Sequence, residues 1–108
     1  MARSKQDDLL AVLSAGHIGQ SRSIGGAALA ARLDVTVRTI RALVRGLREN
    51  AVAVCGSPET GYFIAETSEE LEGTCKLLEI HGIHQLEVAA RMRKTTLPEL
   101  LGQLKLST

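Results

Sequence analysis

Aromatic residues are almost missing from this chain, which has no tryptophan, one tyrosine and one phenylalanine among 108 residues. A densely packed core must therefore be built from leucine, valine, isoleucine and alanine. Alanine and leucine are among the strongest helix formers, so this composition favours a mainly helical domain. The hydrophobic fraction of 44% is typical of a folded globular protein and argues against a disordered chain.

Long apolar runs and cysteines are also scarce. No run approaches the roughly 20 apolar residues that a membrane-spanning helix needs, and the start "MARSKQDDLL" lacks the apolar stretch of a signal peptide. The sequence therefore predicts a soluble, cytoplasmic protein with no membrane partner. Cys55 and Cys75 are too few for a disulfide scaffold, and we expect both to be reduced thiols that fill small apolar spaces.

A net charge of only +1 hides an uneven distribution along the chain. Residues 1–50 carry 8 basic and 4 acidic side chains, whereas residues 51–108 carry 5 basic and 8 acidic ones. Such a division predicts that the first half binds an anion while the second half has another role. The small total charge therefore does not exclude a nucleic-acid partner.

Hydrophobic spacing and turn residues predict a mainly α fold with a small β-hairpin. Three helices come first, and the third has Thr36 as its N-cap. The turn formers "GSPETG" then lie between two β-branched or aromatic stretches, a pattern typical of a hairpin. A capping box of Thr67 and Glu70 begins a long C-terminal helix, and Thr96, Pro98 and Glu99 begin a short terminal one. The expected ranges are 6–16, 26–34, 36–50, 51–65 for the hairpin, 67–94, and a last helix after residue 95.

The segment "GAALAARLDVTVRTIRALVRGLRENAVAVCGSPETGYFI" follows a known pattern. It has a small-residue "LA", then "L-x-V-S/T", "R-T-I/V", a spaced leucine, and a hairpin ending in "GY". Over roughly residues 22–65 the chain resembles the N-terminal winged helix-turn-helix of biotin-operon-repressor-like and DeoR-like bacterial or phage regulators. The resemblance implies a DNA-binding domain at 1–65 and a separate helical extension at 66–108. The ligand-binding and catalytic domains of larger relatives have no counterpart here.

The arginines of the third helix decide between a solvated surface and a DNA-binding face. At 100° per residue, the apolar residues Ile40, Leu43, Val44 and Leu47 fall in an arc of about 100°, as expected of a buried stripe. Four arginines gather beside it within about 80°. Only Glu49 offsets them, so the sequence predicts four unpaired guanidinium groups, which favours DNA over a plain solvated edge. These arginines are Arg38, Arg41, Arg45 and Arg48.

In winged helices the third helix enters the major groove, so the resemblance assigns the contacts. Arg38 and Arg41 are expected to reach bases, and Arg45 and Arg48 phosphates. The hairpin tip carries Glu59 and no basic residue, unlike a basic wing, which argues against strong contact there. The predicted DNA-binding residues are Arg22, Ser23, Thr36, Arg38, Thr39, Arg41, Ala42, Arg45, Arg48, Ser57 and Thr60.

The long helix carries small and apolar residues at spacings of three and four, which indicates a packing seam. A single winged helix reads few base pairs, so we expect this seam to join two copies in a homodimer; packing against the same chain is the alternative. The predicted interface residues are Leu71, Cys75, Leu78, Gly82, Leu86 and Ala89.

No arrangement of residues predicts catalysis or a cofactor. Cys75, His81 and His84 match no common zinc spacing, so surface or packed histidines are expected instead of a metal site. The glycines of "GHIGQSRSIGG" lack the Lys-Ser/Thr of a phosphate-binding loop. The sequence therefore predicts a dimeric, sequence-specific double-stranded DNA-binding protein, a small transcriptional regulator such as a repressor. The alternative is a winged-helix module whose basic helix binds an acidic protein.

Overall fold

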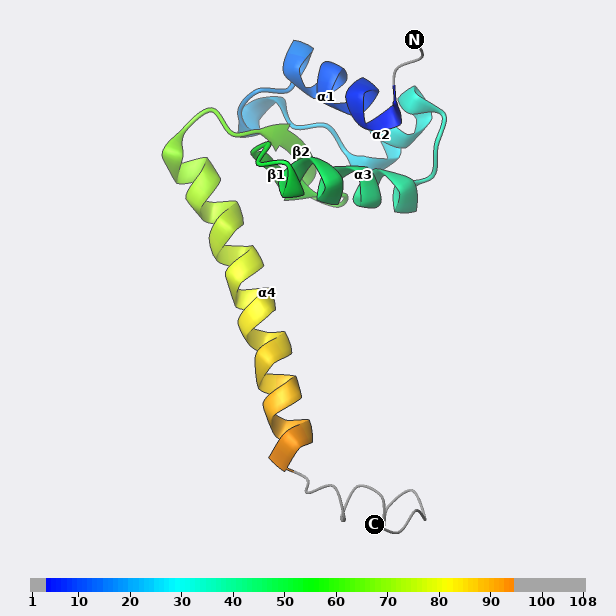
Figure 1. Ribbon diagram of the computed structural model, residues 1–108. Coiled ribbons are helices and arrows are strands. Elements are labelled where there is room, and N and C mark those ends of the chain that lie inside the picture. Colours follow the sequence, from blue (N-terminus) through cyan, green and yellow to red (C-terminus); the bar gives the residue numbers. More distant parts are fainter. Residues whose placement is uncertain (1–3, 95–108) are drawn as a thin grey trace. The chain divides into compact units, whose positions relative to one another are not determined.

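The structure, a computed structural model, describes residues 4–94 and divides into two compact units, Met1–Thr74 and Cys75–Thr108. The predicted mainly helical architecture, with one small hairpin and a long C-terminal helix, is confirmed (Figure 1). The predicted terminal helix at Thr96, Pro98 and Glu99 lies outside the described residues. The elements are α1 (Lys5–Gly16), the 3₁₀ turn η1 (Gln20–Arg22), α2 (Gly26–Leu33), α3 (Val37–Glu49), β1 (Val54–Ser57), β2 (Gly61–Ile64) and α4 (Ser68–Lys94).

Local hydrogen bonds set the ends of the first three helices. The Ser4 hydroxyl accepts from the Asp7 N–H at 3.0 Å and begins α1. Thr36 begins α3 in the same way, because its Oγ1 accepts from the Thr39 N–H at 3.1 Å. Between them, Asp34 ends α2 in the left-handed conformation, with φ of 55°. Aspartate tolerates this conformation better than most residues, so the tight turn from α2 to α3 forms without glycine.

Aliphatic side chains from all three helices and the hairpin build the core of the first unit. Each helix contributes residues spaced by three or four, and the hairpin supplies one face. Tyr62 is the only aromatic residue in this cluster, and Phe63 is buried as well. The core residues are Leu9, Leu13, Leu29, Ala30, Leu33, Ile40, Val44, Leu47, Val54 and Tyr62.

The connector between α1 and α2 extends the hairpin on its free edge. Ile24 and Tyr62 exchange two backbone hydrogen bonds, of 2.9 and 2.7 Å. Further along, the Gly19 N–H donates to the Ile64 carbonyl, and the Ile64 N–H donates to that of His17, each at 2.8 Å. Ile24 thus forms an isolated antiparallel bridge to Tyr62. These bonds hold β2 between β1 and the connector.

The turn of the hairpin packs against the start of α2. The Gly26 N–H donates to the Pro58 carbonyl at 3.1 Å. A Cβ atom added at Gly26 would lie 2.9 Å from the Cβ of Pro58, closer than side chains pack. Glycine is therefore required at position 26 for this approach, and the turn is fixed on the body of the unit.

The first turn of α4 belongs to the first unit, because three hydrogen bonds hold it there. The Glu70 carboxylate accepts from the N–H groups of Gln20, at 2.9 Å, and Glu66, at 2.8 Å. These bonds, from Gln20 first, hold the pKa of Glu70 below the ordinary glutamate value. The buried Cys55 thiol also donates to the Glu70 carbonyl at 3.6 Å. The predicted boundary after residue 65 falls at the end of β2, whereas the compact units divide within α4.

Candidate nucleic-acid interface

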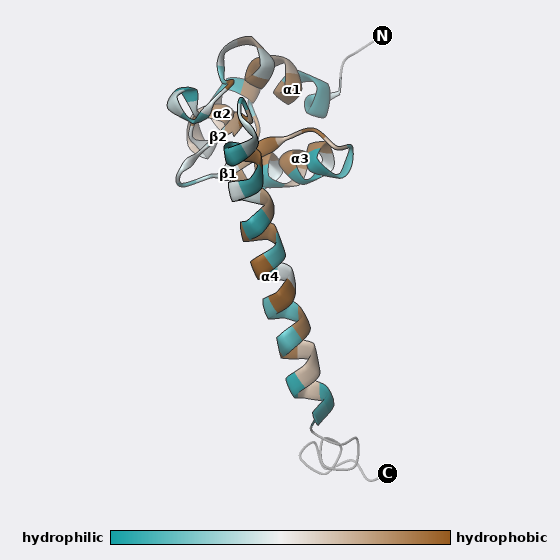
Figure 2. Cartoon of the chain, turned by 90° about the vertical axis from the view of Figure 1, so that its left-hand side faces the viewer, coloured by the Kyte–Doolittle hydropathy of each residue, from teal (hydrophilic) through white to brown (hydrophobic). Residues whose placement is uncertain are grey.

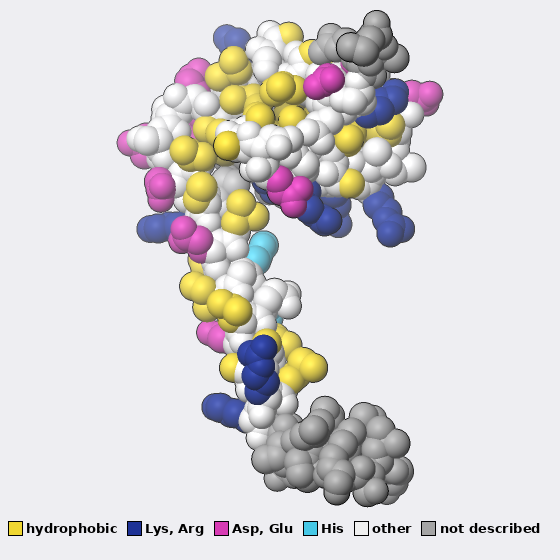
Figure 3. All heavy atoms as spheres, viewed as in Figure 1, with side chains coloured by type: hydrophobic (Ala, Val, Ile, Leu, Met, Phe, Trp, Pro, Cys, Tyr) yellow, Lys and Arg dark blue, Asp and Glu magenta, His cyan; other side chains and the backbone are white. Residues whose placement is uncertain are grey.

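The candidate interface is the solvent-facing side of α3. Ile40, Val44 and Leu47 are buried against the core, which turns the rest of the helix outward. Lys and Arg side chains project along the edge of the first unit where α3 runs (Figures 1 and 3). The four arginines of α3 differ in their partners. They are described below in order of their angle around the helix axis from the buried residues, beginning with the nearest.

Arg48 lies nearest the buried stripe and is bound within the fold. Its Nε donates to the Val54 carbonyl at 2.7 Å, and its Nη2 donates to the Gly56 carbonyl at 3.0 Å. Both acceptors belong to β1, and the Arg48 side chain is half-buried there. The expectation of an unpaired guanidinium is wrong for this residue, because the hairpin brings two carbonyl groups within its reach.

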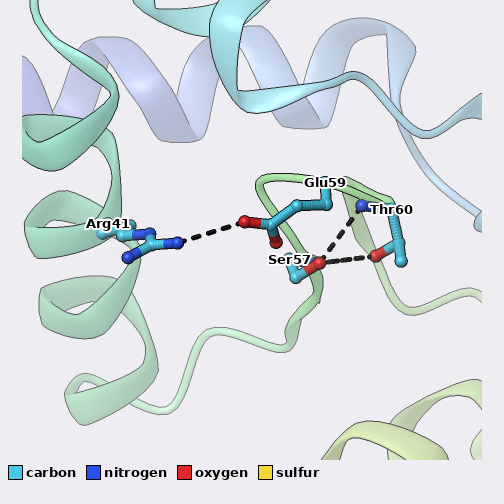
Figure 4. Close-up of polar contacts among 4 residues, drawn as sticks. All are labelled: Arg41, Ser57, Glu59 and Thr60. Carbon is cyan, nitrogen blue, oxygen red and sulfur yellow. Dashed lines mark hydrogen bonds and ion pairs between the residues drawn. The ribbon is translucent and has the colours of Figure 1, made fainter.

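Arg41 comes next and is paired with the hairpin turn. Its Nη2 lies 3.2 Å from Oε1 of Glu59 (Figure 4). The expectation of an unpaired group is wrong here too. A hydrogen bond from its own backbone N–H, one from Ser57, and the charge of Arg41 hold the pKa of Glu59 below the ordinary value. The pair is solvent-exposed, with side-chain exposures of 58% for Arg41 and 72% for Glu59.

Arg38 and Arg45 lie farthest from the core, and both are exposed. Among the described residues, neither side chain forms a hydrogen bond or an ion pair. Ala42 is exposed on the same side of α3. Thr36 and Thr39 lie at its start, where their hydroxyls are 3.0 Å apart and take part in the cap. The surface of α3 thus offers two free guanidinium groups and one paired group.

The predicted contact residues of the hairpin bond to each other. The hydroxyls of Ser57 and Thr60 are 2.8 Å apart, and the Ser57 hydroxyl accepts from the Thr60 N–H at 3.1 Å (Figure 4). The Thr60 hydroxyl accepts in turn from the Ser57 N–H at 3.1 Å. These bonds brace the turn from inside. The two hydroxyls therefore maintain the shape of the turn, and a bound phosphate would have to compete for them.

Arg22 and Ser23 lie in the connector before α2, and both are exposed. The Arg22 carbonyl is 2.7 Å from Nδ1 of His17, which fixes the backbone of η1 while the guanidinium stays in solvent. The Ser23 hydroxyl lies beside Gly61, where a Cβ atom would come within 2.9 Å of it. Ser23 thus borders the start of β2.

The predicted seam on α4 is exposed in the isolated chain. Leu71, Leu78 and Leu86 are 38%, 46% and 68% exposed, Gly82 is exposed, and Cys75 and Ala89 are half-buried. Apolar residues outside the seam are exposed as well, at Leu77, Ile80 and Ile83. Figure 2 shows hydrophobic and hydrophilic residues interleaved along the visible side of α4. The exposed apolar surface of α4 is therefore broader than one predicted seam.

Residues 4–94 contain no group of three or more His, Cys, Asp or Glu side chains placed to hold a metal ion. Within the same range, no helix is long and apolar enough to cross a membrane. His81 and His84 are exposed on α4.

Sequence reasoning missed two functional features of the hairpin turn. The close packing of Pro58 against Gly26 joins positions that are far apart in the sequence. The pair of glycines at 25 and 26 was only a weak indication of this contact. The pairing of Glu59 with Arg41 was missed for the same reason, although the lone acidic residue of the turn was noticeable. Comparisons with protein families, curated proteins and solved structures found no match.

Proposed function

We propose that this protein is a sequence-specific double-stranded DNA-binding protein of the winged helix-turn-helix type, a small transcriptional regulator. The observation that carries the proposal is the free, exposed pair Arg38 and Arg45 beside Arg41 on one side of α3. Glu59 offsets the charge of Arg41, whereas Arg38 and Arg45 have no such partner among the described residues, and two cations on one helix face repel each other unless an anion lies near them. A regularly spaced polyanion supplies that anion, and an α-helix fits the major groove of DNA.

The positions of the arginines along α3 support distinct roles. Arg38 and Arg41 lie in the first turns, from which side chains reach base edges when such a helix enters the groove. Arg45 lies one turn later and is assigned to a phosphate. Arg48, which holds two carbonyl groups of β1, is assigned to positioning the hairpin. Arg22 and Ser23 remain candidates for phosphate contacts from the connector.

The proposal includes a homodimer formed through α4. Two copies of α3 would read two half-sites, which raises affinity and produces a palindromic site. The exposed apolar residues of α4 supply the surface for pairing. Gly82 is also consistent with pairing, because a Cβ atom there would meet nothing within 4 Å in the single chain. Mid-helix glycine costs roughly 1 kcal/mol relative to alanine, and nothing within the described chain requires it.

The test starts from a randomised duplex pool selected with the intact protein. Arg38→Ala and Arg41→Ala should each weaken binding to the enriched duplex by roughly 1–3 kcal/mol and relax one base pair of the site. Arg45→Ala should weaken binding to enriched and scrambled duplexes equally and reduce the salt slope by about one. Fluorescence anisotropy in a salt series measures all three.

Arg91→Ala is the matched control, because it removes the same charge from α4 and should leave selectivity unchanged. An acidic protein partner is the competing function, and it predicts no enrichment from the pool. If the intact protein enriches no duplex, or if all three α3 variants keep the affinity and selectivity of the intact protein, α3 is not a DNA-reading surface.

A further inference from the structure

The hairpin turn, residues 58–60, is held rigidly from two directions. From outside, the Gly26 N–H bonds the Pro58 carbonyl, and only glycine at position 26 leaves room for the proline ring. From inside, the reciprocal bonds of Ser57 and Thr60 brace the turn. Glu59 lies between these restraints. Its backbone is therefore fixed relative to the body of the first unit, although its side chain is exposed.

The ion pair of Glu59 with Arg41 contributes little to stability. Both side chains are exposed, so solvent screens their attraction, and the ordering of two long side chains offsets much of what remains. A rigid turn that presents a single carboxylate to α3 therefore calls for a role other than stability. Arginine has five N–H donors in a planar fork, and the contact with Glu59 engages Nη2. Donors on the rest of the guanidinium stay available for a second partner.

The Glu59 carboxylate beside Arg41 determines which kind of group the guanidinium can bind as its second partner. A phosphate that approached Arg41 would also approach the Glu59 carboxylate, and like charges in contact oppose binding. The acceptors on a base edge, such as guanine O6 and N7, carry no net charge and meet no such repulsion. The lowered pKa of Glu59 keeps the carboxylate ionised at neutral pH. Arg45, which is assigned to a phosphate, has no acidic partner among the described residues that would oppose this contact.

Resting on the DNA-binding function proposed above, we propose that Glu59 is a positioning residue that directs Arg41 to a base edge and excludes it from the phosphate backbone. The hairpin thus acts on DNA through α3 instead of by its own contacts. Its acidic tip, which would weaken a phosphate-binding wing, raises selectivity here by keeping one guanidinium from binding non-specifically.

The test compares Glu59→Gln with Glu49→Gln in the intact protein, using a duplex enriched from a randomised pool and a scrambled duplex of the same composition. Glu49 lies on α3 and does not contact Arg41. Glu49→Gln therefore removes the same charge as Glu59→Gln without changing the surroundings of Arg41, which makes it the matched control. Glu59→Gln should tighten binding to the scrambled duplex and lower the ratio of the two affinities by about tenfold. Selection with this variant should relax one base pair, the same one that Arg41→Ala relaxes.

Glu49→Gln should tighten binding to both duplexes alike and relax no base pair. In an Arg41→Ala background, Glu59→Gln should leave the affinity ratio unchanged, because its effect acts through Arg41. Circular dichroism melting of each variant checks that the fold persists. An unchanged ratio with Glu59→Gln, or the same drop without Arg41, overturns this role while the DNA-binding function stands. If the intact protein enriches no duplex, both proposals fail.

Discussion

The guanidinium of Arg48 forms two hydrogen bonds to carbonyl groups of β1, and its half-buried position keeps water from replacing them. Lysine carries the same charge on a compact ammonium group and lacks the planar, forked guanidinium that reaches two acceptors at once. Arg48→Lys should therefore lower the free energy of unfolding by roughly 1–3 kcal/mol. Urea denaturation followed by circular dichroism measures the change.

Arg45→Lys is the control for this prediction, because Arg45 has no partner among the described residues and its replacement should change stability by less than about 0.5 kcal/mol. Equal stabilities for the two variants would mean that Arg48 does not hold the hairpin.

At the scale of single residues, the sequence predicted where the arginines lie but not what they bind. Helical periodicity places Arg48, Arg41, Arg45 and Arg38 correctly on one side of α3, because it depends only on local geometry. Their partners are set by the hairpin, whose approach to α3 depends on Pro58 meeting Gly26. Such contacts between distant positions leave no periodic pattern, so Arg41 and Arg48 were wrongly expected to be unpaired.

At the scale of elements, α3 depends on a narrow buried stripe. Ile40 is fully buried in the core, so a carboxylate there would be desolvated without a partner. Ile40→Asp should cost at least about 4 kcal/mol, most of the stability of a domain this small. Leu47→Asp should act in the same way. Thermal melting by circular dichroism measures both.

Ala42→Asp places the same carboxylate on the exposed side of α3 and should cost no more than about 1 kcal/mol. A melting temperature for Ile40→Asp as high as that of Ala42→Asp would contradict the buried position of Ile40.

The elements were predicted closely where local chemistry sets their ends. Thr36 begins α3 through a side-chain bond to its own first turn, and Gly16 ends α1 as expected. The hairpin was predictable because turn formers separate two β-forming stretches. The connector was harder, because its bridges to Tyr62 and Ile64 use backbone groups, which every residue has.

At the scale of the whole molecule, the proposed homodimer predicts how α4 responds to charge. Leu78→Asp combined with Leu86→Asp places two carboxylates in the predicted seam and should convert the dimer to a monomer. Multi-angle light scattering across micromolar concentrations measures the mass of each variant. The matched control is Leu77→Asp with Ile83→Asp, two equally exposed positions outside the seam.

The control should stay dimeric. Dissociation by the control and not by the seam variant would move the interface to the other side of α4. A monomeric mass for the intact protein at every concentration would contradict the dimer itself.

The bridges between the connector and β2 have a consequence for the order in which the first unit is completed during synthesis. Helices α1, α2 and α3 precede β2 in the chain and leave the ribosome before it, so the connector stays without its hydrogen-bond partners on β2 until β2 emerges. The apolar side chains that Tyr62 covers are open to solvent for the same interval. Nascent chains with unpaired edges and open cores are prone to aggregation and bind chaperones. A nascent chain stalled with α1, α2 and α3 outside the ribosome and β2 still inside it should therefore be incompletely folded and bound by chaperones.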